Sequence, residues 1–191
     1  MRILMVVRPC QGGILSHVNT LISGLVRAGH QIFVAGLPTP VNQLAEGFFY
    51  LPWSNNPWRL WSSGRMLQSL IYELSPDVVH FQGALAATLG WTIPKGRAIW
   101  VYTAHNFPSV GASGWWRQDG IIAKKMDAVI AVSRSLADVL IQKGVSKEKI
   151  TVIPNGIDLD RFVPQPLRYS PDAPVLLAMG RLVPEKGFAY L

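Results

Sequence analysis

The sequence predicts an α/β fold built on a doubly wound, mostly parallel β-sheet. Short apolar runs with the length of buried strands alternate with segments of helical spacing from the N-terminus to residue 153. Buried strands that alternate with helices form parallel sheets with right-handed crossovers. The chain has no internal repeat and no low-complexity tract.

Glycine, proline and capping residues mark where the expected helices begin and end. Gly29 and Gly144 end two of them, as glycine commonly does after the last helical turn. Pro57 precedes a third helix, with Asn55 or Asn56 as its N-cap. The expected helices cover residues 14–28, 58–74, 84–91, 115–125 and 135–143, and the expected strands cover 3–7, 31–36, 48–51 (at an edge), 77–81, 98–103, 128–132 and 150–153.

The chain divides into one domain, a linker and the beginning of a second domain. Residues 163–174 contain four prolines among polar residues, a composition typical of an interdomain linker. We therefore assign residues 1–162 to the first domain. The apolar run at 175–179 predicts a strand, and the loop after it carries glycine and cations and opens a helix, so a second domain begins in 175–191. At 191 residues the chain is too short for two full domains.

Composition limits the classes of protein to which the chain can belong. Hydrophobic residues make up 49% and charged residues 15% of the chain, which indicates a compact core. No apolar run approaches the roughly 20 residues of a membrane span, and the N-terminus lacks the apolar region of a signal peptide. A single cysteine, Cys10, excludes an internal disulfide framework and fits a reducing compartment. We therefore expect a cytoplasmic protein.

The net charge of +7 calls for an anionic partner. The basic residues are scattered and form no nucleic-acid-binding motif, so no nucleic-acid partner is expected. Two partners remain open, a membrane surface that carries anionic lipid and a phosphate-bearing substrate. One cysteine and four separated histidines give no metal-ligand spacing, so no metal site is expected.

Polar residues follow the ends of several expected strands, where open parallel sheets bind their ligands. Gly12 and Gly13 follow the first strand and precede a helix, so backbone amides there can approach a phosphate or a sugar hydroxyl. A tight turn alone would also explain them. His105 and Asn106 follow a later strand, where a histidine can bind a sugar hydroxyl, act as an acid or base, or form a structural hydrogen bond. His80 ends another strand and points to the same edge of the sheet.

Two further groups of candidates lie in the C-terminal half of the chain. Arg181 and Lys186 flank a strand-to-helix loop, where a planar fork and a point charge suit a diphosphate; surface charge is the alternative. Ser133 follows a strand but lacks the Gly-x-Ser-x-Gly pattern of a nucleophile. Ser133 or Ser135 is therefore expected to cap the next helix.

Several motifs occur in a fixed order after the Gly-Gly loop, and together they resemble the large GT-B family of retaining glycosyltransferases called group 1 or family 4. The resemblance spans the whole chain, and the last two motifs are the specific ones. The motifs are Pro-Asp-Val-Val-His at 76–80, Thr-Ala-His-Asn at 103–106, Ala-Val-Ser-x-Ser at 131–135, Val-Ile-Pro-Asn-Gly-Ile-Asp at 152–158 and Gly-Arg-Leu-Val-Pro-Glu-Lys-Gly at 180–187.

The resemblance implies two Rossmann-like domains that face each other across a cleft. The N-terminal domain would bind the acceptor and the C-terminal domain the nucleotide-sugar donor. Gly12 and Gly13 would face the donor phosphates or the transferred sugar, and His105 would contact that sugar near the reacting carbon. Asn155 and Gly156 would form the loop at the crevice between the domains.

On the donor side, the resemblance implies that Arg181 and Lys186 clamp the diphosphate as it leaves. The reaction would then need no metal or other cofactor, because the nucleotide-sugar is a co-substrate. The family's acidic Glu-x7-Glu element and its nucleotide-base pocket are missing from this sequence, and Asn106 stands where many relatives carry Asp or Gly. We therefore expect the N-terminal half of a GT-B enzyme, inactive without the missing C-terminal domain.

Two segments combine tryptophan with cations, residues 52–61 and residues 114–117 with Trp115 and Trp116. They would form a wall of the acceptor site that stacks on sugar rings, or a lip that rests on lipid headgroups. Packing in the core is the alternative. The expected acceptor is a sugar, a lipid-linked molecule or a small molecule, and a membrane contact would place the protein at the inner face of the membrane.

Two other functions are compatible with parts of the sequence. A sugar-nucleotide epimerase shares the GT-B fold, although the Gly-Arg-Leu-x-x-Glu-Lys-Gly loop at 180–187 argues against it. A non-catalytic module that binds carbohydrate or a membrane surface is the other, and native termination at Leu191 would favour it.

Overall fold

The chain divides into two compact units, Met1–Asp158 and Leu159–Leu191, in a computed structural model. The structure describes residues 1–8, 12–36, 43–54, 56–106, 119–163, 176–180 and 187–190. The predicted linker at 163–174 falls almost entirely outside these ranges, so the predicted domain boundaries stay predictions.

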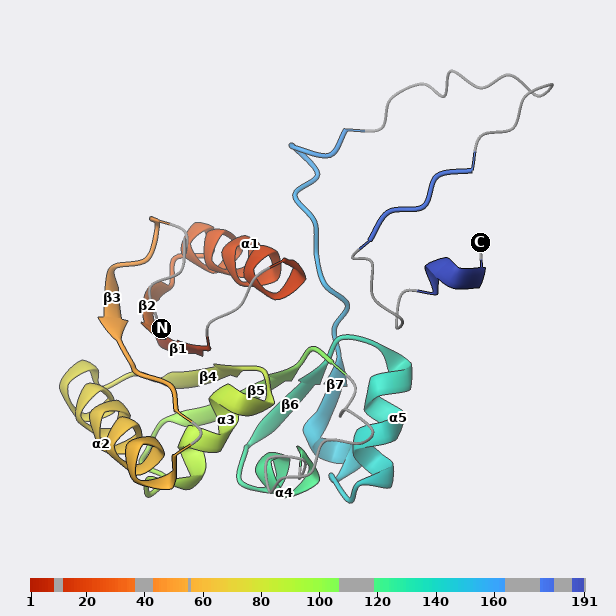
Figure 1. Cartoon of the computed structure of the whole chain (residues 1–191). Helices are drawn as coiled ribbons and strands as arrows, with labels where there is room; N and C mark the ends of the chain where they lie inside the picture. The colour runs from red at the N-terminus through yellow and green to blue at the C-terminus, as the bar shows by residue number, and fades with distance from the viewer. Residues whose placement is uncertain are drawn as a thin grey trace. The chain divides into compact units, whose positions relative to one another are not determined.

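The first unit is built on one seven-stranded sheet in which every neighbouring pair of strands is parallel (Figure 1). The strand order is β3-β2-β1-β4-β5-β6-β7. This arrangement confirms the predicted parallel α/β fold and the edge position of the third strand. The strands are β1 (Arg2–Val7), β2 (Gln31–Gly36), β3 (Gly47–Tyr50), β4 (Val78–Gln82), β5 (Ile99–Ala104), β6 (Ala128–Ala131) and β7 (Ile150–Val152).

Capping side chains start two of the helices as the sequence predicts. The Asn56 side chain accepts a hydrogen bond from the Trp58 backbone amide at 3.0 Å, and the Ser133 hydroxyl accepts one from Leu136 at 3.2 Å. In the described ranges, no helix is both long enough and apolar enough to cross a membrane. The helices there are α1 (Gly13–Arg27), α2 (Pro57–Leu74), α3 (Ala84–Trp91), α4 (Asp119–Lys124), α5 (Arg134–Gln142), and the 3-10 helices η2 (Lys147–Lys149) and η4 (Phe188–Tyr190).

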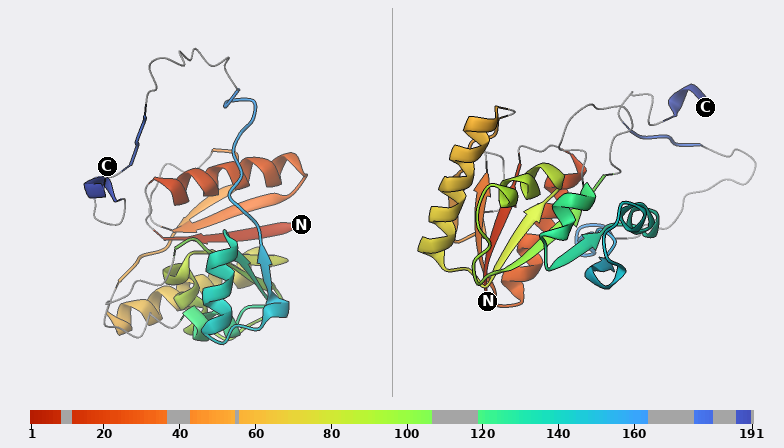
Figure 2. Two further views of the ribbon diagram at one scale, coloured as in Figure 1. Left: turned by 90° about the vertical axis from the view of Figure 1, so that its right-hand side faces the viewer. Right: turned by 90° about the horizontal axis from the view of Figure 1, so that it is seen from below.

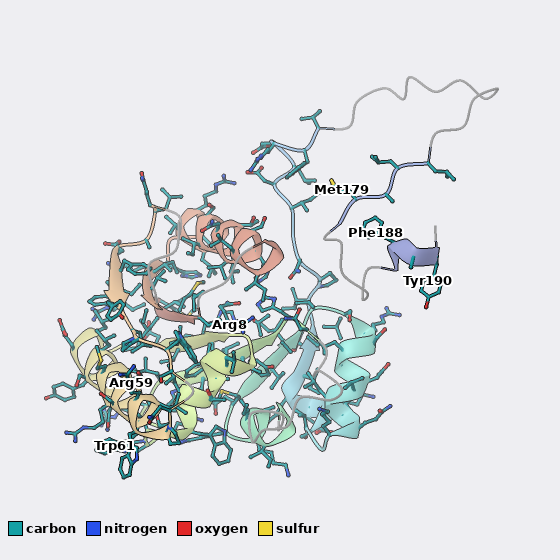
Figure 3. The ribbon with its side chains drawn as sticks, viewed as in Figure 1. Arg8, Arg59, Trp61, Met179, Phe188 and Tyr190 are labelled. Carbon is teal, nitrogen blue, oxygen red and sulfur yellow. The ribbon has the colours of Figure 1, made fainter. Side chains whose placement is uncertain are left out.

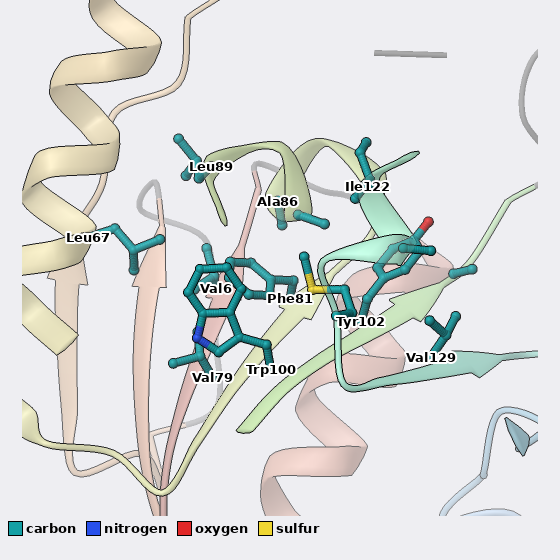
Figure 4. Close-up of a cluster of buried hydrophobic side chains, with 14 of the residues drawn as sticks. Val6, Leu67, Val79, Phe81, Ala86, Leu89, Trp100, Tyr102, Ile122 and Val129 are labelled. Carbon is teal, nitrogen blue, oxygen red and sulfur yellow. The ribbon is translucent and has the colours of Figure 1, made fainter. Parts of the chain in front are cut away.

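Apolar side chains pack against both faces of the sheet. Successive residues of a strand point to opposite faces, so β1 contributes Met5 and Val7 to the cluster beneath α1 and Val6 to the cluster on the other face. Figure 2 shows α1 on one face of the sheet and α2 and α3 on the opposite face. In the second cluster, the rings of Phe81 and Trp100 meet edge to face at 5.4 Å between centroids (Figure 4).

The same alternation places two polar residues of β4 on the face that α1 covers. His80 pairs in register with Met5, and Gln82 pairs with Val7. Both polar side chains are buried. Buried polar groups need hydrogen-bond partners. Because the strand pairing buries His80 and Gln82, their side chains must bond to other groups of the protein.

A glycine lets the end of β2 approach β1 closely. A Cβ atom added to Gly36 would lie 2.2 Å from the backbone carbonyl oxygen of Val7, which is much closer than real side chains come. Because Val7 is the last residue of β1, this contact fixes the position from which the chain leaves the sheet. Gly36 therefore supports the edge of the sheet where ligands of such folds bind.

In the second unit, the described part of the segment predicted to form a strand at 175–179 is not a strand. Residues 176–180 form neither helix nor strand, and Leu176 is 98% exposed. A strand is stabilised by hydrogen bonds to a neighbouring strand and by packing of its side chains, and Leu176 has no such packing. The prediction was therefore wrong for residues 176–179, and the helix predicted to follow is described as the short η4 alone.

Candidate functional site

The order of the strands identifies one place in the sheet as the favoured ligand site. From β1 the chain proceeds to β2 and β3 on one side, whereas β4 to β7 follow on the other side. In open parallel sheets, ligands bind where this direction reverses, beyond the carboxyl ends of the strands. The site is therefore expected beyond the ends of β1 and β4.

A chain of hydrogen bonds joins four polar side chains at this place. His80 Nε2 lies 2.7 Å from the Thr103 hydroxyl oxygen and 3.2 Å from Gln82 Nε2. Gln82 Oε1 in turn lies 2.9 Å from His105 Nε2. The members come from the last residues of β4 and β5 and from the residue that follows β5. We call these four residues, with His17 of α1, the histidine cluster.

The orientation of the Gln82 amide is compatible with one protonation pattern of the two rings. Its NH2 group faces His80, so it donates to His80 Nε2, which must accept. Its carbonyl oxygen faces His105, so His105 Nε2–H donates to it. His80 is then protonated at Nδ1, and His105 at Nε2. This tautomer leaves Nδ1 of His105 as an acceptor.

His17 approaches the cluster from α1. Its ring meets the ring of His105 edge to face, with 4.9 Å between centroids and 70° between planes. Its Nε2 atom is buried and has no hydrogen-bond partner among the described residues. His17 therefore fixes the plane of the His105 ring by packing rather than by a hydrogen bond.

Burial keeps the histidines of the cluster neutral at physiological pH. It lowers the pKa of His80 to about 3, with smaller contributions from His17 and His105. Burial also lowers the pKa of His105 to about 4, helped by the charges of His17 and of Arg8, the residue directly after β1 (Figure 3). Burial alone lowers the pKa of His17. The cluster can therefore donate and accept hydrogen bonds at pH 7 without carrying charge.

Glycines lie at the N-caps of the two helices that follow β1 and β4. Gly12 caps α1 with φ of 66° and Gly83 caps α3 with φ of 89°, a left-handed region that favours glycine. A Cβ atom on Gly12, Gly13 or Gly83 would meet no described atom within 4 Å. The helix N-termini present backbone N–H groups beside the histidine cluster, a suitable environment for an anion or a hydroxyl.

The structure places the other predicted site residues in different ways. Asn106 is the second residue after β5 and is exposed. Asn155 and Gly156 are also exposed and follow β7, two strands away from β5 in the sheet. The remaining four candidates lie outside the described residues: Trp115, Trp116, Arg181 and Lys186.

Sequence reasoning missed three members of the cluster, Gln82, Thr103 and His17. The signal for Gln82 is its spacing, because residues two apart in a strand share a face and His80 precedes it by two. Thr103 is the partner of Gln82 in the β4–β5 register, which the sequence alone does not give. Within the described residues, no group of three or more metal-ligating side chains is close enough to hold a metal ion.

Comparison with known proteins identifies a family and a curated relative. Residues 11–161 match the model of a family described as Glycosyltransferase Family 4. A phosphatidylinositol N-acetylglucosaminyltransferase subunit from Arabidopsis thaliana is 25% identical over 197 residues, which cover 94% of this chain and 44% of the plant protein. The chain thus spans less than half the length of that relative.

Solved structures share the fold. A glycosyltransferase from Rickettsia africae superposes with a TM-score of 0.66 and 22% identity, over 90% of this chain and 46% of the bacterial chain. Anabaena HepE in complex with UDP and glucose superposes with a TM-score of 0.62 and 20% identity, over 84% of this chain and 46% of that chain. Both are similar to this chain in its seven-stranded α/β architecture.

Proposed function

This chain belongs to Glycosyltransferase Family 4, and from that premise we propose that it is the acceptor-side half of an enzyme that transfers a sugar from a nucleotide-sugar to an acceptor with retention of configuration. The observation that carries the proposal is the neutral histidine cluster at the point where the strand order reverses. His105 directly follows β5, and its neutral ring can accept a hydrogen bond from a sugar hydroxyl.

The roles of the other residues follow from the same proposal. The N–H groups at Gly12 and Gly13 face the donor phosphates or the transferred sugar, which suits the N-terminus of a 15-residue helix. Asn155 and Gly156 border the crevice between the two halves. Catalysis needs the donor to be held and its departing diphosphate to be stabilised. Arg181 and Lys186 begin that second site without a metal, and this chain alone does not turn over.

A lipid-linked acceptor is the class that we propose first. The name of the relative from Arabidopsis thaliana includes phosphatidylinositol, and α2 carries features of a membrane contact. Trp58 is 80% and Trp61 51% exposed, the Arg65 guanidinium lies 5.0 Å from the centre of the Trp61 ring, and Arg59 of the same helix is also exposed (Figure 3). Tryptophan and arginine on one helix surface suit an interface with anionic lipid.

This membrane contact gives the location that we propose, in the cytoplasm and at the inner face of a membrane. Sedimentation with vesicles tests it, with neutral vesicles compared with vesicles that contain anionic lipid. The chain should bind the anionic vesicles, because each arginine near an anionic surface contributes about 1 kcal/mol to binding. Binding should fall as the salt concentration rises, since salt screens this attraction. Exchange of Trp58 and Trp61 for Ala should abolish binding, whereas Tyr72→Ala, on the same helix, should not. Binding that ignores both salt and the double exchange contradicts the contact.

Transferase activity is tested with the product of the full native reading frame and with the 191-residue chain side by side. Each is incubated with a panel of nucleotide-sugars and with phosphatidylinositol or soluble sugars as acceptors. The native product should form a glycoside with the anomeric configuration of the donor, and His105→Ala should reduce its kcat by about 100-fold. Turnover by the 191-residue chain alone overturns the assignment as half of an enzyme. A native product that transfers no sugar overturns the transferase proposal.

A further inference from the structure

Gln82 has a part in the candidate site that neither the sequence nor the family assignment gives it. It is the last residue of β4, its side chain is fully buried, and its amide lies between two imidazoles. One end of the amide lies 3.2 Å from His80 Nε2, and the other lies 2.9 Å from His105 Nε2. An amide donates hydrogen bonds through its nitrogen and accepts them through its oxygen, so the two imidazoles must play opposite hydrogen-bonding roles.

We infer that Gln82 is a positioning residue that holds His80 and His105 in opposite tautomers and thereby presents Nδ1 of His105 as an acceptor to the ligand. The amide donates to His80 Nε2, so the proton of His80 sits on Nδ1. It accepts from His105 Nε2–H, so His105 carries its proton on the nitrogen that faces the protein. Only the last step, the contact with a sugar hydroxyl, rests on the proposed function.

The surroundings of Gln82 hold its amide in place. Thr103 stands opposite Gln82 in the register of β4 and β5, and its hydroxyl lies 2.7 Å from the same nitrogen of His80. Thr103 and Gln82 are both buried, so water does not compete for these bonds at the protein end of the cluster. When Gln82 donates to His80 Nε2, the Thr103 hydroxyl must donate to that nitrogen too, so both neighbours require it to carry no proton.

The ring of His105 is fixed by two contacts of different kinds. Gln82 sets the direction of Nε2 by a hydrogen bond, and the edge of His17 meets the ring at 4.9 Å. A neutral ring with a set tautomer discriminates a hydroxyl that donates from a group that only accepts. Positioning by Gln82 therefore gives His105 a specificity that an unrestrained histidine lacks.

Nitrogen NMR of the histidine rings in the 191-residue chain tests this inference without any substrate. The spectra are recorded at about pH 8, above the ordinary histidine pKa, where protonated and unprotonated ring nitrogens give well-separated signals. We expect His80 protonated at Nδ1 and His105 at Nε2. The same tautomer on both rings, the reverse pair, or averaged signals from either ring overturns the inference.

Two variants and one control separate positioning from mere packing. The carboxylate of Gln82→Glu, ionised at about pH 8, offers only acceptors, so His80 should move its proton to Nε2 while His105 keeps its own there. Gln82→Leu removes both bonds, and the protected Nε2 proton of His105 should vanish through exchange with water. Gln142→Leu, at an exposed position at the end of α5, should leave both rings unchanged.

The outcomes are independent of catalysis. A His80 signal that does not move in Gln82→Glu, or a His105 proton that persists in Gln82→Leu, overturns the positioning role. If Gln82→Leu does not fold, Gln82→Glu and the wild-type tautomers still decide. A chain with the expected tautomers whose native product transfers no sugar refutes the proposed function alone.

Discussion

Acidification should destabilise this protein well above the pH at which carboxylates usually protonate. His80 has its pKa lowered to about 3 and His105 to about 4 in the folded protein, whereas both titrate near 6.5 when unfolded. Between the folded and the unfolded pKa values, the unfolded chain therefore binds protons at these histidines and the folded chain does not. Their contribution to stability is fully present above pH 6.5 and is lost as the pH falls from 6.5 toward 4 and then 3.

The size of the effect follows from the same values. When the pH falls from 7 to 5, each of the two histidines lowers the free energy of unfolding by about 2 kcal/mol. Together they lower it by roughly 3 to 4 kcal/mol, because part of His105 is exposed to solvent, which screens its charge. The total stability of a domain is about 5 to 15 kcal/mol. The carboxyl groups of Asp127 and Glu148 have lowered pKa values in the folded protein, so their contribution is lost mainly below about pH 5 and adds little to the slope in this window.

Urea unfolding followed by tryptophan fluorescence, at a series of pH values from about 7.5 to 5, measures this slope. The free energy of unfolding should be flat near pH 7.5 and fall steadily below pH 6.5. His80→Gln should lower stability at every pH but make the slope clearly shallower, because one of the three histidines whose pKa is lowered by burial is gone. Gln142→Leu, at an exposed position outside the histidine cluster that carries no titrating group, should keep the slope of the wild type. A flat profile in the wild type, or an unchanged slope in His80→Gln, would show that burial does not lower the pKa values of these histidines.

Two further predictions concern stability at neutral pH, and urea unfolding measures both. Gly36→Ala should lower the free energy of unfolding by about 1 to 3 kcal/mol, because the new Cβ would lie 2.2 Å from the carbonyl oxygen of Val7. Gly24→Ala lies in a helix, where the new Cβ has no described atom within 4 Å, and it should instead raise stability by roughly 0.5 to 1 kcal/mol. Equal effects of the two variants would contradict the close approach of Gly36 to β1. Ser133→Ala should lower the free energy of unfolding by about 1 kcal/mol, because it removes the N-cap of α5. The control Ser135→Ala, at an exposed position, should change stability by less than about half of that. If Ser133→Ala leaves stability unchanged, the cap contributes nothing.

Much of the first unit could be predicted from the sequence because its signals are local. The apolar run at 31–36 coincides with β2, and the capping side chain of Asn56 lies where the sequence places it. Spacing, capping and glycine stops act within a few residues, so they can be read without knowledge of distant contacts.

The predictions that failed or were incomplete depend on contacts between distant residues. The apolar run at 175–179 reads as a strand, yet residues 176–180 form none, since a strand also needs a neighbour. His80 and His105 were candidates because each follows or ends a strand. That Gln82 lies between them depends on the β4–β5 register, and no property of residues 82 and 105 in the sequence specifies it.

The pairing of β1 with β4 also has a consequence for how the protein is made. Ile3 stands opposite Val78, so the centre of the sheet closes only after a long stretch of chain has been synthesised. Closing such a loop is slow compared with forming local structure. Until β4 arrives, β1 has a bare edge that can pair with another chain. A nascent chain that ends before β4 therefore exposes an unpaired edge of β1 at the centre of the future sheet, beside the histidine cluster.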